Sequence, residues 1–359
     1  MSRTLGRDAV FLRPTPRIAH TEYSVSTYHT GLIEATLGPR RGAPDENRRF
    51  CDAWDYDFLF GVHDGPVGWN LCGRVTDMGH ADYAENGTDR RPAGACPFES
   101  PREVLEFDAV REYGLPDKAE LVRFYENHYQ TQSAAFPNQL CTGGYYKTVI
   151  SGAIHAFGWE MLLLAAAEPE RFARVLESFG ALTLHHVEAW AKTSIEVFIQ
   201  HDDFVWTEGP FLHPDVYRHV IVPLYRRCWE VLHRAGKRVL FCSDGTYTMF
   251  MPDLAQAGAE GFIFEPSNDF EWVVRHFGRT HCLVGSAVDC RTLTFESWSA
   301  VQRELDRTLA LAPQCAGLIW AVGNHFPANI PTAMGQRYID YLRAHWSRTT
   351  PADAAHGDT

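Results

Sequence analysis

In the second half of the chain, short runs of consecutive apolar residues alternate with longer amphipathic stretches. Such runs are typical of parallel strands that are buried on both faces, and the stretches between them are typical of helices that cover a sheet. The pattern predicts strands at VFIQ (197–200), RVLFC (238–242), GFIF (261–264), CLVGS (282–286) and GLIWAV (317–322). It predicts helices at Pro214 to about Ala235, around Pro252–Leu254, before Cys282, at Phe295–Leu311 and at Thr332 to about His345.

The first half offers three further strands, at RIAHTEY (17–23), DYDFLFGVHD (55–64) and QLCTGG (139–144). Together with the later runs they predict a single (β/α)8 TIM barrel domain over residues 1–348. An open doubly wound sheet is the alternative, but no GxGxxG motif follows an early strand. The segment 70–101 is rich in Gly, Asp and Pro, which predicts a long loop insertion after strand two. Residues 349–359 are small and polar and are expected to form a disordered tail.

The net charge of the chain argues against two classes of binding partner. A net charge of −12 argues against nucleic acid and against an anionic membrane surface. The chain has no apolar stretch long enough for a membrane span, and its first residues lack the apolar run of a signal peptide. Nine cysteines without a CxxC pair fit reduced thiols and no closed zinc knuckle. We therefore expect a cytoplasmic enzyme with a small-molecule substrate.

Polar residues end the predicted strands, and in barrels catalytic groups sit at these carboxyl ends. The residues concerned are His20 and Glu22 (strand one), His63 and Asp64 (two), His201, Asp202 and Asp203 (four), Cys242 and Asp244 (five), Glu265 (six), Asp289 (seven), and Asn324 and His325 (eight). Alternate residues of a strand point the same way, so His20 pairs with Glu22, His201 with Asp203, and Cys242 with Asp244. Mixed N, O and S ligands of this kind favour zinc.

We take the candidate metal ligands to be His20, His201, Cys242, Asp244 and His325. The candidate acid–base groups are Glu22, Tyr146, Asp203 and Asp244, and the candidate substrate-binding residues are His63, Asp64, Tyr145, Glu265 and Asn324. Each has a structural alternative. Cys242 and His20 are compatible with buried packing, Asp244–Gly245 with an ordinary turn, and His201 with a loop contact. Tyr145–Tyr146 could equally mark the start of a helix.

Several stretches resemble the uroporphyrinogen decarboxylase superfamily. They are TGGYYKTVISGAIHAFGWEMLLLAAAEPERFARVL (142–176), the segment from HDDFVW to CSDG (201–245), MPDLAQAGAEGFIFEP (251–266) and GLIWAVGNHFPANIP (317–331). The superfamily includes the decarboxylase of haem synthesis and methyltransferases that work with corrinoid proteins. The resemblance implies a (β/α)8 barrel with its site at the strand carboxyl ends. Relatives often dimerise, so it also implies a homodimer.

The chain departs from both familiar patterns of that superfamily. The porphyrin decarboxylases carry an Arg-Gln-Ala-Gly-Arg segment, whereas FLRPTPRIAHTEYS (11–24) has only Arg13 and Arg17. Their late histidine aligns with Asn324, one residue before His325. The corrinoid-linked methyltransferases similarly bind zinc through a His-x-Cys and a late Cys, and here those slots hold Cys242, Asp244 and Asn324–His325. The usual corrinoid-binding signature, Asp-x-His-x-x-Gly, is absent from the sequence, so cobalamin would sit on a partner protein.

Three functions follow as hypotheses. The leading one is a zinc-dependent methyltransferase or demethylase of a small molecule that works with a separate corrinoid protein. The second is a decarboxylase of a small carboxylic acid, in which an acidic group protonates the centre left by CO2 loss. The third, from another class, is a non-catalytic ligand-binding relative, because every ligand slot of the methyltransferases holds a different residue here.

Overall fold

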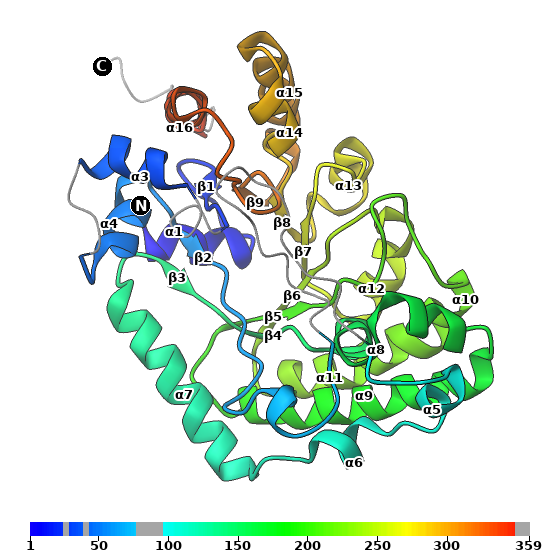
Figure 1. Cartoon of the computed structure of the whole chain (residues 1–359). Coiled ribbons are helices and arrows are strands. Elements are labelled where there is room, and N and C mark those ends of the chain that lie inside the picture. The colour runs from blue at the N-terminus through cyan, green and yellow to red at the C-terminus, as the bar shows by residue number, and fades with distance from the viewer. Residues whose placement is uncertain (24–28, 39–42, 77–95, 349–359) are drawn as a thin grey trace, which may run out of the picture.

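Parallel strands form the centre of the molecule, and helices surround them (Figure 1). The computed structural model describes residues 1–23, 29–38, 43–76 and 96–348. The strands are β1 (Ala19–His20), β2 (Phe58–Leu59), β3 (Leu140–Cys141), β4 (Gly143–Tyr145), β5 (Val197–His201), β6 (Arg238–Cys242), β7 (Gly261–Phe264), β8 (Cys282–Gly285) and β9 (Gly317–Trp320). All eight predicted strands are therefore present, with the third divided into β3 and β4 at Thr142.

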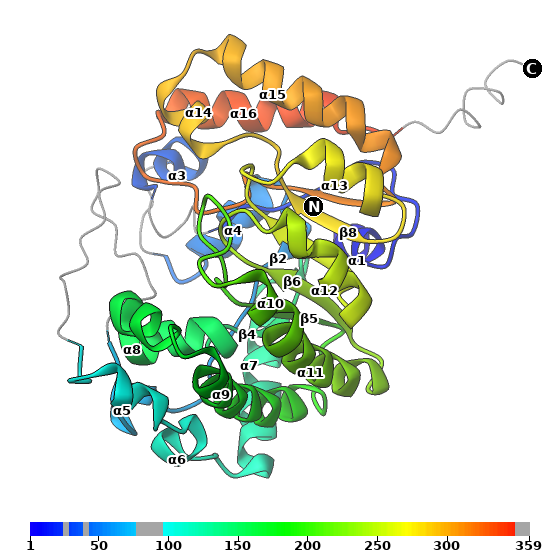
Figure 2. The same cartoon turned by 90° about the vertical axis from the view of Figure 1, so that its right-hand side faces the viewer.

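The helices between the strands lie around the outside, as the views in Figures 1 and 2 show. The longer ones are α1 (Arg3–Val10), α3 (Thr30–Leu37), α4 (Glu46–Ala53), α7 (Lys118–Ala135), α8 (Val149–Ala165), α9 (Pro169–Trp190), α11 (Val222–Arg234), α13 (Phe270–Phe277), α15 (Trp298–Leu311) and α16 (Thr332–His345). Shorter ones are η1 (Trp69–Leu71), α5 (Pro101–Leu105), α6 (Ala109–Tyr113), α10 (Pro214–Val216), η2 (Tyr217–Ile221), η3 (Thr248–Phe250), α12 (Met251–Ala257), α14 (Cys290–Phe295) and η4 (Ala312–Gln314).

The strands run in the order expected of a barrel. One sheet has the order β1-β9-β8-β7-β6-β5-β4, and β2 pairs with β3, which continues into β4. Between β1 and β2 the structure shows single contacts rather than a ladder. The Asp57 amide donates to the His20 carbonyl (2.8 Å), and Asp57 Oδ2 accepts from the His20 amide (3.0 Å). The buried carboxylate of Asp57 also accepts from Arg17 (2.8 Å), so a polar cluster joins these two strands.

Both faces of the strands are buried, which explains their continuous apolar runs. On β5, Val197 and Ile199 belong to the inner core, whereas Phe198 belongs to the outer core beneath the helices. Helix α1 contributes Leu5 and Val10 to the inner core, so its apolar face packs against the barrel interior. The approach of β4 to its surroundings is close, because a Cβ atom on Gly144 would lie 2.6 Å from the Ile199 carbonyl oxygen.

Two predicted helices are interrupted. The helix expected from Pro214 to about Ala235 contains a π-helical turn, Tyr217–Ile221, just before Pro223. Proline has no amide hydrogen to donate in an α-helix, which accounts for an irregular turn there. The helix expected over 295–311 begins earlier, as α14, stops at Phe295 and resumes at Trp298.

The predicted insertion at 70–101 falls largely outside the described residues, and its described flanks contain η1 and the start of α5. The tail predicted at 349–359 lies outside them altogether. Within the described part of the chain, none of the helices has the length and apolar character required to cross a membrane.

Candidate metal centre

Three consecutive polar residues at the end of β5, His201, Asp202 and Asp203, point in two different directions. Because side chains alternate along a strand, His201 and Asp203 share one direction and Asp202 takes the other. The Nε2 atom of His201 lies 3.1 Å from Oδ1 of Asp203. Asp202 is fully buried on the helix side, where it accepts hydrogen bonds from the amides of Val149 and Ser151 (3.1 and 2.6 Å). The Asp203 carboxylate thus faces the site, whereas the carboxylate of the neighbouring Asp202 binds the start of α8.

His201, Asp203 and Asp244 form a cluster that could hold a metal ion. Each offers one ligand atom, and these atoms all lie within 4.8 Å of one another. The side chains of His201 and Asp203 are 19% and 21% exposed, and Asp244 is exposed. The cluster lies where β5 and β6 end, since His201 is paired with Cys242 in the ladder. A group of this composition and exposure can reach both an ion and a substrate from solvent.

The charges in this cluster are strongly coupled. Burial opposes ionisation of His201, but the carboxylates of Asp203 and Asp244 outweigh it and raise the pKa of the imidazole. Burial also opposes ionisation of Asp203, yet the nearby imidazole and its hydrogen bond lower the pKa of that carboxyl. Although part of Asp244 is exposed, the protein that surrounds its carboxyl, followed by the charges of Asp203 and Glu265, raises the pKa of Asp244 well above its usual value. The His201 imidazole and the Asp203 carboxylate thus favour each other's charged form, whereas the Asp203 charge opposes a second negative charge on Asp244.

Tyr146 holds Asp203 from the opposite side. Its hydroxyl donates to Asp203 Oδ2 (2.9 Å), and its ring lies 4.4 Å from that of His201. Burial, together with the charge of Asp203, raises the pKa of the phenol well above its usual value, so it remains a donor. Asp64 orients this loop, since its Oδ1 accepts from the amides of Tyr146 and Lys147 (2.9 and 3.1 Å). The structure thus brings Tyr146 to the cluster directly and Asp64 through the backbone.

Glu265 and Asn324 support Asp244. Glu265 Oε2 accepts from the amide of Gly245 (2.6 Å), and Oε1 accepts from the Asn324 side chain. A hydrogen bond from Asn324 also favours the ionised form of Asp244. These two predicted substrate-binding residues therefore lie beside the cluster, after the ends of β7 and β9.

Cys242 and His325, two predicted ligands, lie outside the cluster of the described residues. The Cys242 side chain belongs to the inner core with Ile199 and Ile263, and burial raises the pKa of its thiol well above its usual value. The backbone of His325 pairs with that of Tyr23, and its carbonyl accepts from Cys290 Sγ (3.3 Å). Cys242 is paired with His201 in the ladder and His325 follows Asn324, but neither joins the three ligand atoms.

His20 and Glu22, also predicted for the site, form a separate buried network. His20 Nδ1 contacts the Trp54 carbonyl oxygen (2.9 Å), and Nε2 contacts Glu22 Oε1 (3.3 Å). Glu22 accepts in addition from the Tyr338 hydroxyl (2.6 Å) and the Val322 amide (2.9 Å). Both ring nitrogens and both carboxylate oxygens are thereby engaged, which gives the pair a structural role between β1, β9 and α16.

Two further predicted substrate-binding residues point away from the cluster. The Tyr145 ring is fully buried and stacks on His186 of α9, with the centroids 4.6 Å apart. His63 packs edge-on against Phe124 and His128 of α7 (centroids 4.9 and 4.6 Å). Alternation explains both positions, because Tyr145 and His63 each precede the residue that serves the site.

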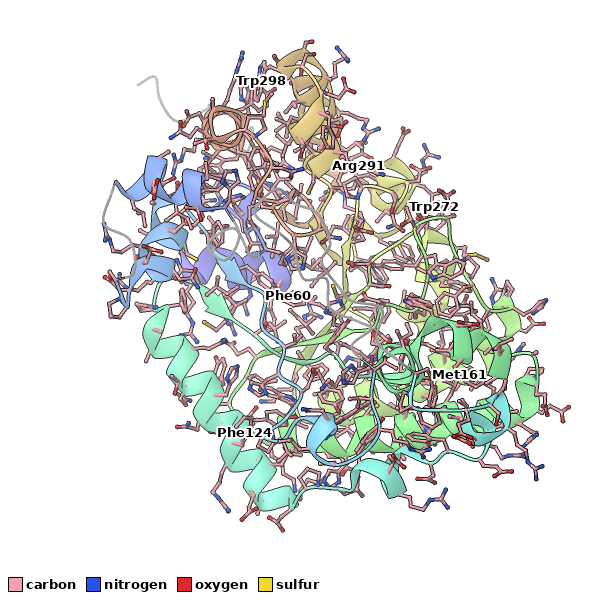
Figure 3. All side chains as sticks on the ribbon, viewed as in Figure 1. Phe60, Phe124, Met161, Trp272, Arg291 and Trp298 are labelled. Carbon is pink, nitrogen blue, oxygen red and sulfur yellow. The ribbon has the colours of Figure 1, made fainter. Side chains whose placement is uncertain are left out.

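Residues that the sequence did not single out also contact the site. The Phe60 ring packs edge-on against His201 with centroids 5.6 Å apart, and Figure 3 labels Phe60 near the middle of the ring of strands. The alternation of Phe58, Phe60, Val62 and Asp64 along strand two was the available signal. Asp202 is one of the polar residues predicted at the end of strand four, but its direction toward the helices and its bond to the Tyr225 hydroxyl (2.6 Å) depend on tertiary packing.

A pocket opens beside the Glu265–Asn324 pair. Its volume is ≈ 440 Å³, and it is lined by residues of the loops after β5, β7, β8 and β9 and by helix α14. The lining residues include Thr207, Glu265, Ser267, Asp289, Arg291, Thr294, Phe295, Asn324, His325, Ala328 and Asn329. A volume of this size suits a small organic molecule.

Comparison with known proteins agrees with this architecture. The described fold is similar to that of a methyltransferase from Methanosarcina mazei, with 14% sequence identity, a TM-score of 0.60, and coverage of 95% of this chain and 97% of that one. A putative vitamin-B12 independent methionine synthase from Listeria monocytogenes is 13% identical, with a TM-score of 0.41 over 62% of this chain and 70% of its own. No curated protein matches the chain in sequence.

The family comparison is more specific. The family model described as Uroporphyrinogen decarboxylase (URO-D) matches residues 151–345, which is more than half of the chain and includes β5 to β9 with the strand ends that carry His201, Asp203 and Asp244. The chain therefore belongs to the uroporphyrinogen decarboxylase family.

Proposed function

We propose that this protein is a metal-dependent methyltransferase or demethylase of a small molecule, with zinc bound by His201, Asp203 and Asp244. The observation that carries the proposal is the convergence of these three ligand atoms within 4.8 Å at the carboxyl ends of barrel strands. A separate corrinoid protein would exchange the methyl group. The fold shared with a methyltransferase from Methanosarcina mazei supports the same reading.

The residues present fit a zinc ion of open coordination. One imidazole nitrogen and two carboxylate oxygens are three protein ligands, which leaves a fourth position for substrate or water. When bound, zinc would supply Lewis acidity to a substrate atom in that position. Oxygen ligands make this a harder set than a thiolate set, so it suits an alkoxide, water or carboxylate better than a thiolate.

The chain's own residues would orient the ion and the substrate. Tyr146 and Glu265 act on the two carboxylate ligands, Tyr146 by its hydroxyl bond to Asp203 and Glu265 through the Gly245 amide. Such supporting bonds hold ligands in position and tune their basicity. In this arrangement Asp203 binds the metal and Tyr146 is the nearest proton donor, whereas Glu22 remains committed to its buried network.

Elemental analysis of the purified protein tests the metal site. We expect one zinc per chain in the wild type and its loss in His201→Ala and Asp244→Ala. Cys242→Ala is the matched control, because Cys242 lies in the adjacent layer and outside the cluster, and it should retain zinc. Zinc lost from Cys242→Ala but retained by Asp244→Ala would refute this ligand set.

Methyl transfer can be assayed with free cob(I)alamin, whose methylation changes its visible spectrum. With 2-methoxyethanol as the methyl donor, zinc-loaded wild type should form methylcobalamin, and Asp244→Ala should not. Zinc binding without methyl transfer from any methyl ether or methylamine of a test panel would count against the reaction while leaving the metal site intact.

Decarboxylation of a small acid is the second candidate. The observation in its favour is the exposed carboxyl of Asp244, which lies beside His201 and Asp203 at the strand ends, where it could donate a proton to a substrate. Release of CO2 from a carboxylic acid by metal-free protein, abolished in Asp244→Asn, would select this function over methyl transfer.

A further inference from the structure

The charges around the pocket next to the metal cluster do not favour the binding of an acid. Asn324 and Glu265 line it, and Glu265 accepts from the amide of Gly245, the residue after Asp244, so the pocket adjoins the cluster. A substrate bound in the pocket could therefore extend its reacting atom toward Asp244. The charged and polar groups of the pocket lining then determine which chemical groups the rest of the substrate can carry.

Among the described residues that line this pocket, Arg291 of α14 is the one Lys or Arg side chain, and His325 adds an imidazole (Figure 3). Its guanidinium already binds Asp289, with Nη2 2.8 Å from Oδ2 and Nε 3.2 Å from both carboxylate oxygens. The amide of Arg291 also donates to Asp289 Oδ1 (2.8 Å), so the pair is held by backbone and side chain together. A carboxylate ligand would have to compete with Asp289 for the guanidinium.

The remaining charge near the pocket is negative. Glu265 lines the pocket itself, and Glu304 of α15 accepts from the amide of Asp289 (2.9 Å). An anion placed here would meet like charges, which disfavours its binding. Each oxygen of Glu265 already accepts one hydrogen bond, from Gly245 or from Asn324, so an ammonium group would have to share this carboxylate with them.

Apart from the His325 imidazole, uncharged polar groups make up the rest of the hydrogen-bonding surface. Thr207, Ser267 and Asn329 line the pocket, and the Ser267 hydroxyl oxygen is buried without a hydrogen-bond partner among the described residues. Such groups pair with hydroxyls and amides rather than with full charges. The exposed ring of Phe295 adds an apolar face at the edge of the lining.

We propose that this pocket binds the non-reacting part of an uncharged substrate that carries hydroxyl or amide groups, and that the Asp289–Arg291 pair excludes carboxylates. The inference rests on the proposed function, since it places the reacting methyl-bearing oxygen at the His201–Asp203–Asp244 cluster. It names the substrate class that this site accepts.

Three probes of matched size test the charge preference directly: 2-methoxyethanol, methoxyacetate and 2-methoxyethylammonium. Their dissociation constants for the zinc-loaded and metal-free protein can be measured by ligand-observed NMR titration. We expect the neutral ether to bind at least about tenfold more tightly than either ion in the metal-free protein, which corresponds to the loss of one hydrogen bond to a charged group. Tighter binding of methoxyacetate or of the ammonium compound by that form would overturn the proposal.

Amino-acid substitutions test whether the preference for the neutral ether arises in the pocket. Ala328→Phe should abolish binding of 2-methoxyethanol by filling the pocket, whereas Ala344→Phe on the exposed face of α16 should leave it unchanged. Asp289→Asn keeps a residue that can cap α14 and releases Arg291, so it should raise the affinity for methoxyacetate about tenfold. An unchanged preference in Asp289→Asn would refute the role of the pair.

Failure of the proposed function and failure of this inference give different experimental results. Binding needs no methyl transfer, so a protein that prefers the neutral ether but never methylates cob(I)alamin retains this inference and loses the reaction. A protein that methylates cob(I)alamin but binds methoxyacetate best retains the reaction and loses this inference.

Discussion

His201 and Asp203 face each other at the end of β5, with Nε2 and Oδ1 3.1 Å apart, while Asp202 between them points to the helix layer. The two aspartates are neighbours in sequence and belong to different parts of the molecule. Asp203 accepts from Tyr146 and faces the site, and Asp202 accepts from three consecutive amides at the start of α8 and from Tyr225. Their substitutions should therefore have separable effects.

Asp202→Asn should lower the free energy of unfolding by about 3 kcal/mol, because an amide cannot accept from all of these donors and leaves buried N–H groups without partners. Asp203→Asn should have a smaller effect on stability and should abolish zinc binding. Urea unfolding and elemental analysis of both variants provide the comparison. Equal losses of stability in the two variants would contradict this division.

Tyr146→Phe should weaken zinc binding about tenfold, since it removes the hydroxyl that orients Asp203. Tyr145→Phe is the matched control on the adjacent residue, because the Tyr145 ring stacks on His186 behind the barrel wall. Competition with a chromophoric zinc chelator measures both affinities. The prediction fails if the two variants bind zinc equally well.

Asp57→Ala should lower the free energy of unfolding by about 3 kcal/mol. The substitution removes a buried carboxylate that accepts from Arg17, from the Ser2 amide and from the His20 amide at the contact between β1 and β2. Glu106→Ala, which removes an exposed ion pair with Arg102, should change stability by less than about 1 kcal/mol. Denaturant titrations that rank these variants in the opposite order would contradict the role of Asp57.

Stability should fall on acidification because of His186. Burial, followed by the positive charges around it, lowers the pKa of this imidazole to about 3 in the folded protein, whereas the unfolded chain titrates near its usual value. The unfolded state therefore binds more protons below pH about 6.5, and this contribution is lost progressively as the pH falls toward the folded pKa. Between pH 7 and pH 5 the loss from this group should be on the order of 2 kcal/mol.

His186→Gln should remove that part of the pH dependence and retain a polar partner for Tyr125, whose hydroxyl lies 2.7 Å from His186 Nδ1. Guanidinium unfolding at several pH values between 5 and 7 gives the slope for each protein. A wild-type slope that persists in His186→Gln would show that another group is responsible.

The barrel strands could be predicted because burial on both faces leaves continuous apolar runs, as in VFIQ and GFIF. The polar strand ends could be predicted as well, because chemistry in a barrel concentrates there. His201, Asp203 and Asp244 were all among the predicted site residues, and the alternation of β5 correctly separated His201 and Asp203 from Asp202.

The choice among equivalent strand ends depended on tertiary packing. His20 and Glu22 have the same spacing as His201 and Asp203. The carboxylate of Glu22, however, already accepts hydrogen bonds from the Tyr338 hydroxyl of the last helix and from the Val322 amide. No local pattern links residues so distant in the chain. The same limit applies to Tyr145 and Tyr146, where only the direction of β4 decides which ring reaches Asp203.

The division of labour between Asp202 and Asp203 also has an evolutionary consequence. Because the support of α8 depends on Asp202 alone of the two, mutations at Asp203 can change the ion or the reaction while the scaffold stays intact. A single-residue insertion or deletion in β5 would exchange the two positions and damage both at once. Diversification of activity at this strand end should therefore proceed by substitution, with its length held constant.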